Sequence, residues 1–224
     1  MKAQTGLTLD RVTLGLGGVR LLGPLSLTVA PGEIVTLMGP SGSGKSSLLA
    51  LICGTLDPVF TTSGQMLLNG RPLDGLPPER RGVGILFQDD LLFPHLSVGE
   101  NLAFALPPGL RGRAARRARV EAALAEAGMA GFADRDPATL SGGQRARAAL
   151  MRTLLAEPAA LLLDEPFSKL DAKLKTRFRD FVFDHARGLG LPTLLVTHDP
   201  ADAAATGGPV IEQPATADPP QRSS

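Results

Sequence analysis

The sequence predicts an α/β fold with a mainly parallel core sheet, an N-terminal antiparallel β part and an α-helical subdomain. Short runs that are apolar on both faces are typical of buried parallel strands, and four occur here, at 33–38, 83–88, 159–164 and 192–198. Helical patterns separate them, which is typical of α/β folds. Two alternating segments, 7–14 and 25–29, predict half-exposed antiparallel strands ahead of the core.

Composition indicates a cytoplasmic globular protein. The 224 residues are 43% hydrophobic and 20% charged, with a formal net charge of +1, which argues against a general polyanion binder but is compatible with local charged patches; no nucleic-acid partner is expected. The lone cysteine, Cys53, lies in the apolar stretch "LLALICG" and is expected to fill the core. Neither a signal peptide nor an apolar run of about 18 residues is present, so a membrane role is expected to depend on a partner.

The remaining elements follow from caps and turn residues. Asn69-Gly70 predicts the turn of a hairpin within 64–73, and Ser97 with Glu100 predicts a capping box. Helices are expected over 46–53, 114–127 and 171–187, and residues 97 to about 156 are helical in pattern. We expect residues 1–224 to form a single domain, with a helical subdomain at about 89–156 and a disordered tail at about 212–224.

A phosphate-binding loop follows the first buried strand. The residues Gly39, Gly44, Lys45 and Ser46 match the pattern G-x-x-x-x-G-K-[ST], with a strand before it and a helix after it. Backbone N–H groups and the helix N-terminus favour phosphate there, while the lysine reaches the β- and γ-phosphates and the serine is a Mg²⁺ ligand. The expected ATP site comprises Gly39, Pro40, Ser41, Gly42, Ser43, Gly44, Lys45, Ser46 and Ser47.

Two carboxylates end a later buried strand, in "LLLDEP". Asp164 is expected to hold Mg²⁺, mostly through water, and Glu165 to act as general base on the attacking water. His198, ending "TLLVTH", is a candidate for the γ-phosphate, and Gln88, ending "GILFQ", for metal and water. Each of these residues alone is also compatible with a capped strand end or a helix start.

The segment "TLSGGQRARAAL" begins a helix with a second candidate phosphate cradle. Ser141 and Gln144 match a capping box, which needs no ligand. Gly142 and Gly143, however, each cost roughly 1 kcal/mol in a first helical turn, and this indicates close approach of the backbone to an anion. A head-to-tail pair of chains would let each cradle contact the other chain's γ-phosphate.

Taken together, these motifs resemble the ATP-binding subunit of ABC transporters. The resemblance covers about residues 5–200 and rests on "GPSGSGKSS", Gln88, "LSGGQ", "LLLDEP", "SKLD" and His198, in this order. Three stretches, "IVTLMGPSGSGKSSL", "GILFQDDLLF" and "DPATLSGGQRAR", are most similar to the YnjD-like branch of bacterial importers. More broadly, the chain resembles subunits that drive thiamine, polyamine, sulfate, molybdate and iron uptake.

The resemblance implies a cytoplasmic ATPase, peripheral on the inner face of the membrane, that dimerises around two ATP molecules with Mg²⁺ and drives a permease. A periplasmic or extracellular solute-binding protein would complete an importer. Asp171 matches the loop that crosses the dimer interface, and Asp89–His95 matches the segment that receives the permease. Leu91, Leu92, Phe93 and His95 are the contact candidates, although they are equally compatible with an apolar loop packed on the helical insertion.

The chain departs from the family pattern at three places. Leu16 stands where the family usually stacks adenine on an aromatic side chain, and residues 1–59 contain no Phe, Tyr or Trp. Lys169 in "SKLD" replaces a commoner small residue. After His198 the usual two strands are reduced to "GGPVIEQ", with no regulatory domain following. Feedback through such a domain is therefore not expected.

Other functions remain open at this point. A separate-subunit exporter, a soluble ABC-type ATPase acting on DNA or ribosomes, and a non-hydrolysing regulator are the alternatives. The short stretch between Lys45 and Ser141 argues against a DNA-repair coiled coil, and intact Glu165 and His198 argue against a regulator. The arginines of "RGRAARRAR" are expected to form a solvated helix face, with anionic lipid headgroups as the alternative ligand: Arg111, Arg113, Arg116, Arg117 and Arg119.

Overall fold

The computed structural model describes residues 6–214, and the chain forms two compact units. Of the described residues, the first unit contains 6–85, Ala159–Glu165 and 183–214. The second contains Leu86–Pro158 and Pro166–Val182. Part of the expected disordered tail, residues 215–224, lies outside the described residues.

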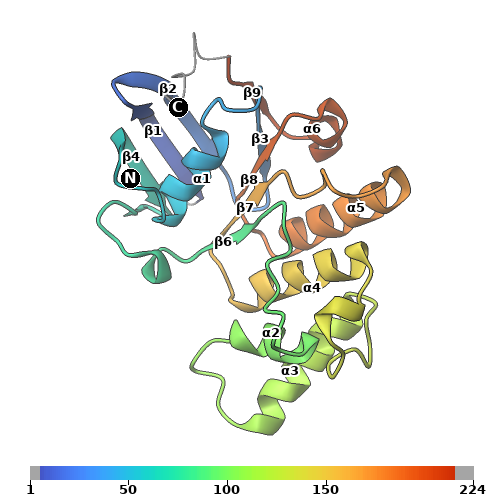
Figure 1. The fold of residues 1–224 in the computed structure, drawn as a ribbon. Coiled ribbons are helices and arrows are strands. Elements are labelled where there is room, and N and C mark those ends of the chain that lie inside the picture. The colour runs from blue at the N-terminus through green and yellow to red at the C-terminus, as the bar shows by residue number, and fades with distance from the viewer. Residues whose placement is uncertain (1–5, 215–224) are drawn as a thin grey trace, which may run out of the picture. The chain divides into compact units, whose positions relative to one another are not determined.

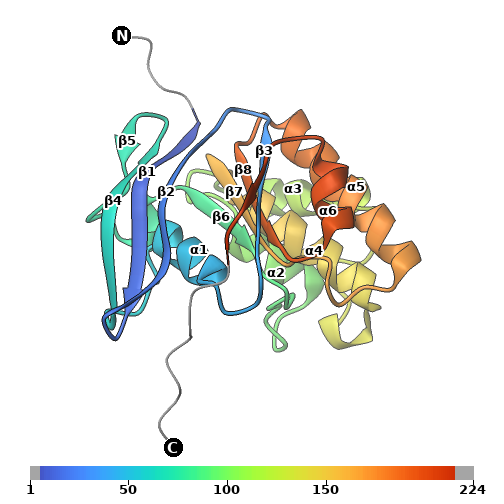
Figure 2. The same ribbon diagram turned by 90° about the horizontal axis from the view of Figure 1, so that it is seen from above.

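An antiparallel sheet begins the first unit, as the alternating segments predict. Its strand order is β2-β1-β4-β5, and the strands lie side by side in Figure 2. Gly17 and Gly18 join β1 to β2 with φ values of 58° and 80°, which suits a tight hairpin turn. The strands are β1 (Leu7–Leu16), β2 (Val19–Val29), β4 (Phe60–Leu68) and β5 (Arg71–Pro72).

The second sheet is the predicted core, with strand order β6-β7-β8-β3-β9. β3 pairs in parallel with β8 and β9, and β7 pairs in parallel with β8. Parallel strands bring their carboxyl ends to one edge, where the site residues follow β3, β7 and β8. The strands are β3 (Ile34–Met38), β6 (Val83–Leu86), β7 (Ala160–Asp164), β8 (Thr193–Thr197) and β9 (Val210–Glu212).

Helix α1 (Lys45–Cys53) lies between the two sheets of the first unit (Figure 2). Its buried Leu48, Leu49 and Ile52 share one apolar cluster with residues of β1, β2, β3, β7 and β8. Cys53 is 9% exposed and belongs to this cluster, which confirms that it fills the core. The phosphate loop therefore leads into a helix whose apolar face is anchored in the core.

The second unit is largely helical (Figure 1). α2 contacts both α3 and α4, and buried Val120, Leu124 and Leu150 belong to its apolar core. The elements are α2 (Val98–Phe104), α3 (Arg113–Glu126), the 3₁₀ turn η2 (Pro137–Thr139) and α4 (Gly142–Leu155). Helix α5 (Ala172–Gly188) begins in this unit and ends in the first.

Three elements differ from the sequence expectation. β2 begins at Val19 rather than at Leu25, because bulges in its pairing with β1 disrupt the alternation. A short helix, α6 (Pro200–Thr206), follows β8 where we expected no helix, with Asp199 as its N-cap. The 3₁₀ turn η1 (Pro78–Arg80) precedes β6. Over the described residues, we find no helix with the length and apolarity needed to cross a membrane.

Candidate functional site

The phosphate loop has the backbone that its glycines predict. Gly42 and Gly44 have φ values of 81° and 83°, a region that side-chain-bearing residues rarely occupy. Gly39 allows a close approach, since a Cβ there would lie 2.7 Å from the carbonyl oxygen of Gln213. The loop can thus turn its N–H groups inward just before the N-terminus of α1, an arrangement that favours anions.

Lys45 is only 5% exposed, although it carries a charge. Its Nζ donates to the carbonyl oxygens of Gly39 and Pro40, at 2.8 and 2.6 Å. Burial lowers the pKa of Lys45, while the nearby carboxylates of Glu165 and Asp164 oppose that shift. The ammonium group is therefore held inside the loop, where an incoming phosphate can replace the carbonyl oxygens.

Ser46 and Asp164 meet across the first unit. The Ser46 hydroxyl donates to the Asp164 carboxylate at 2.9 Å. Burial raises the pKa of the Asp164 carboxyl, and the hydrogen bond from Ser46 opposes this effect. These oxygen donors fit Mg²⁺, which favours few protein ligands and completes its shell with water and phosphate oxygens.

Glu165 and His198 form a close pair at the ends of β7 and β8. Nδ1 of His198 lies 3.1 Å from Oε1 of Glu165. Glu165 has a φ of 45°, unusual for a residue with a side chain, and its N–H donates to the Val196 carbonyl at 3.0 Å. Backbone strain of this kind persists where the surroundings fix it, often at functional sites. The first unit thus brings Glu165 and His198 together, and it also contains Lys45 and Ser46.

The 141–144 segment belongs to the second unit, and its two glycines have different surroundings. The capping box is present: Ser141 N–H donates to the Gln144 side chain at 2.9 Å, and Gln144 N–H donates to Ser141 Oγ at 3.4 Å. A Cβ on Gly143 would lie 2.6 Å from a methyl group of Leu174, so this glycine has a packing role. Gly142 has no such neighbour, since a Cβ there would meet only Arg145 at 4.0 Å.

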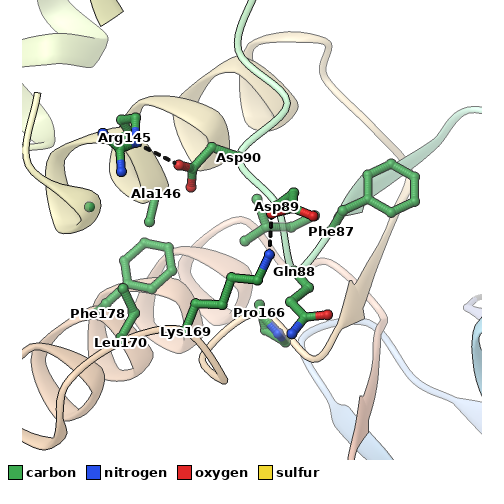
Figure 3. Close-up of a pocket in the computed structure, with 12 residues that line it drawn as sticks. Phe87, Gln88, Asp89, Asp90, Arg145, Ala146, Pro166, Lys169, Leu170 and Phe178 are labelled. Carbon is green, nitrogen blue, oxygen red and sulfur yellow. Dashed lines mark hydrogen bonds and ion pairs between the residues drawn. The ribbon is translucent and has the colours of Figure 1, made fainter. Parts of the chain in front are cut away.

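Gln88 begins an exposed stretch that two cations hold from either side (Figure 3). Lys169 forms an ion pair with Asp89, and Arg145 contacts Asp90 at 3.1 Å. The side chains of both ion pairs line a cavity of about 150 Å³. Lys169 thus connects the "SKLD" loop to the residue after Gln88, a role that the sequence does not indicate.

Asp171, expected at a dimer interface, also caps α5. Its carboxylate accepts from the N–H of Leu174 at 3.0 Å, and its carbonyl accepts from the N–H of Lys175 at 2.7 Å. The Asp171 side chain is exposed, so the cap leaves it accessible to a second molecule.

Sequence reasoning missed two residues that fix the 91–97 loop. Asn101 is fully buried, and its amide donates to the carbonyls of Phe93, Leu96 and Ser97. Arg152 donates to the Leu91 carbonyl at 2.8 Å. The sequence did contain one signal for this role. Asn101 is a polar residue at an apolar position of the helix "VGENLAF", and a buried polar side chain needs hydrogen-bond partners.

The arginine run is partly structural. Arg116 donates to the carbonyls of Ala103 and Leu110, at 2.7 and 3.2 Å. Arg117 contacts Asp134 at 3.1 Å and Glu121 at 3.5 Å. The Arg116 contacts stabilise the turn into α3. The ion pairs of Arg117 are exposed and are expected to contribute little to stability.

Comparison with known proteins settles the family. Residues 22–168 match the family model described as "ABC transporter". The chain belongs to the ABC transporter family. ATP-binding domains of this family hydrolyse ATP, so the chain is an ATPase, and the resemblance inferred from its motifs is confirmed.

Relatives in the ABC transporter family support the same conclusion. "Uncharacterized ABC transporter ATP-binding protein YnjD" of Escherichia coli (strain K12) is 52% identical over 199 residues, covering 89% of this chain and 91% of that protein. "Fe(3+) ions import ATP-binding protein FbpC" of Brucella abortus (strain 2308) is 42% identical over 204 residues, covering 91% of this chain. The match spans 57% of that relative's length.

A solved structure of an ABC transporter cassette confirms the fold class. It is described as "Dimeric Structure of MJ0796, a Bacterial ABC Transporter Cassette". The TM-score is 0.78 at 30% identity, and the match covers 93% of this chain and 94% of that one.

Proposed function

We propose that two copies of this chain, peripheral on the inner face of the membrane, bind two ATP molecules between them and drive solute import through a partner permease. The proposal includes Mg²⁺ as the metal and a solute-binding protein as a further partner. Each chain acts as one nucleotide-binding domain, with a helical subdomain at about 89–156. The relatives whose printed names include import make uptake the favoured direction.

The first unit supplies the chemistry. Lys45 and the loop N–H groups bind the β- and γ-phosphates, and Ser46 with Asp164 would hold Mg²⁺, which neutralises phosphate charge when bound. Glu165 accepts a proton from the attacking water, and His198, 3.1 Å away, holds that carboxylate and reaches the γ-phosphate. Leu16 lies beside the base. Gln88 belongs to the second unit, and its expected role toward water and metal stays part of the proposal.

The second copy supplies the other half of each site. Ser141, Gly142, Gly143 and Gln144 form a cradle for the γ-phosphate bound by the partner, and Asp171 lies at the interface. Gly142 supports this assignment, because it is exposed and has free space around it. The relative described as a dimeric cassette is consistent with two copies.

Replacing Gly142 by Ala separates ligand contact from helix capping. Gly142 is in the first turn of α4 without a positive φ, so Ala is expected to maintain or raise the free energy of unfolding, by up to about 1 kcal/mol. We expect ATPase activity to fall at least about tenfold, since the added methyl group blocks close approach of phosphate to the backbone. Thermal unfolding and ATPase assays check the two effects. Wild-type ATPase activity in Gly142→Ala would mean that the 141–144 segment only begins α4 and does not bind phosphate.

One observation supports the permease contact: Leu91 and His95 on the loop after Gln88, and Phe104 at the end of α2, are exposed. Leu91 is 55% and Phe104 71% exposed. Phe93 lies between Phe104 and His95, with ring centroids 5.1 and 6.0 Å away. Hydrogen bonds from Asn101 and Arg152 hold the backbone of this loop, and its exposed side chains are available to a partner.

Crosslinking tests this contact. Burial raises the pKa of the Cys53 thiol to about 11, so Cys53 stays unreactive at neutral pH and an introduced cysteine is the reactive one. We expect His95→Cys to crosslink in native membranes to a polytopic membrane protein, identified by mass spectrometry. Leu189→Cys, at a residue 60% exposed in the first unit, is the matched control and is expected to remain uncrosslinked. Equal labelling of both variants would contradict the assigned surface.

A further inference from the structure

The end of the antiparallel sheet carries a row of three apolar side chains on three neighbouring strands. Leu16 of β1 pairs with Val19 of β2 and with Phe60 of β4. Residues directly opposite each other project from the same face, with Cβ atoms about 4.5–5.5 Å apart. All three side chains are partly exposed. Phe60 is the first Phe, Tyr or Trp of the chain.

This row lies on the face that packs against α1. Leu14 and Leu16 are two residues apart in an unbroken part of the β1–β4 register, so their side chains share one face. Leu14 is fully buried in the cluster that contains Leu48 and Leu49 of α1. The row therefore lies on the core-facing side of the sheet, at the end of the sheet that the core leaves partly exposed.

The row also lies within reach of the phosphate loop. A Cβ on Gly44 would lie 3.4 Å from Cβ of Leu22, so the start of α1 contacts β2 at that residue. Leu22 pairs with Leu14, two positions from Leu16. Two strand spacings of about 4.8 Å and two residues of about 3.4 Å put Phe60 on the order of 12 Å from Leu22, which is comparable with the reach of an extended nucleotide from phosphates to base.

We propose that Phe60 provides the aromatic face on which the base of the bound nucleotide stacks, with Leu16 and Val19 extending the apolar surface. This inference rests on the proposed function, in which the phosphate loop holds ATP. Phe60 thereby replaces, from the neighbouring strand, the aromatic side chain that Leu16 lacks. Stacking tolerates any base because every base has a π-face, so ATP and GTP bind with affinities within several-fold of each other.

A single tryptophan gives a direct test, because the chain contains no Trp or Tyr of its own. We expect the emission of Phe60→Trp to be quenched by saturating MgATP and unchanged by inorganic tripolyphosphate with Mg²⁺, which has no base. Val59→Trp is the matched control: Val59 is 61% exposed and precedes the ladder, so its emission is expected to respond to neither ligand.

Calorimetry provides the second readout. Phe60→Ala is expected to weaken MgATP binding about five- to tenfold and to leave tripolyphosphate binding unchanged; adding Leu16→Tyr to that variant is expected to restore ATP affinity. Normal ATP affinity in Phe60→Ala, or an unquenched Phe60→Trp that binds ATP, would overturn the stacking role alone. A wild-type chain that binds neither MgATP nor tripolyphosphate would instead overturn the phosphate site, and the stacking role with it.

Discussion

Replacing Glu165 by Gln is expected to lower the ATPase rate by about 10²–10⁴ while leaving ATP binding intact. The amide retains the size of the carboxylate and a hydrogen-bonding oxygen toward His198, which lies 3.1 Å away in the wild type. It has no basicity, however, and cannot accept a proton from the attacking water. The kcat is therefore expected to fall with an unchanged Kd for MgATP.

The same variant should reveal the dimer. With hydrolysis blocked, ATP stays bound and the closed pair accumulates, so light scattering is expected to give twice the 23.3 kDa chain mass with MgATP and one mass without it. Glu79→Gln, an exposed carboxylate of η1, is the control and should retain wild-type turnover. A Glu165→Gln chain that remains monomeric at saturating MgATP, alone and with its permease, would count against the two-copy site.

Mixing two inactive variants should restore activity. Lys45→Ala removes the phosphate lysine, and Gly142→Asp places a negative charge in the cradle while keeping the Ser141–Gln144 capping box. In a head-to-tail dimer, a mixed pair has one intact site, formed by the lysine of one chain and the glycine of the other. An equimolar mixture is then expected to recover about one quarter of wild-type activity when the sites act independently.

Gly142→Asp is preferable to a substitution at Ser141, because Ser141 Oγ caps α4 and its loss costs about 1 kcal/mol. An acidic residue in the first turn is favourable for the helix. If activity does not recover, two explanations are open. The number of ATP molecules bound per mixed dimer distinguishes them. One ATP retained per mixed dimer indicates that both sites must act together, whereas none indicates that each site forms within one chain.

The sequence by itself determined the local parts of the site. The phosphate loop, the carboxylates after a buried strand and the capping box at Ser141 each depend on a few consecutive residues, and glycine positions and strand ends encode them directly. Parallel strands bring their carboxyl ends to one edge, but the order that makes β7 and β8 neighbours, and so brings Glu165 to His198, comes from the tertiary structure.

Tertiary structure alone decided two kinds of contact: those set by the register between strands, and those between segments that are distant in the sequence. The pairing of Leu16 with Phe60 follows from a register shift between Asp10 and Thr13, and a shift of one residue would turn either side chain to the other face. The need for glycine at 143 arises from Leu174 on another helix, and the ion pair of Lys169 with Asp89 joins two loops. Such contacts have no local signature, because the residues that make them are brought together by packing of whole elements.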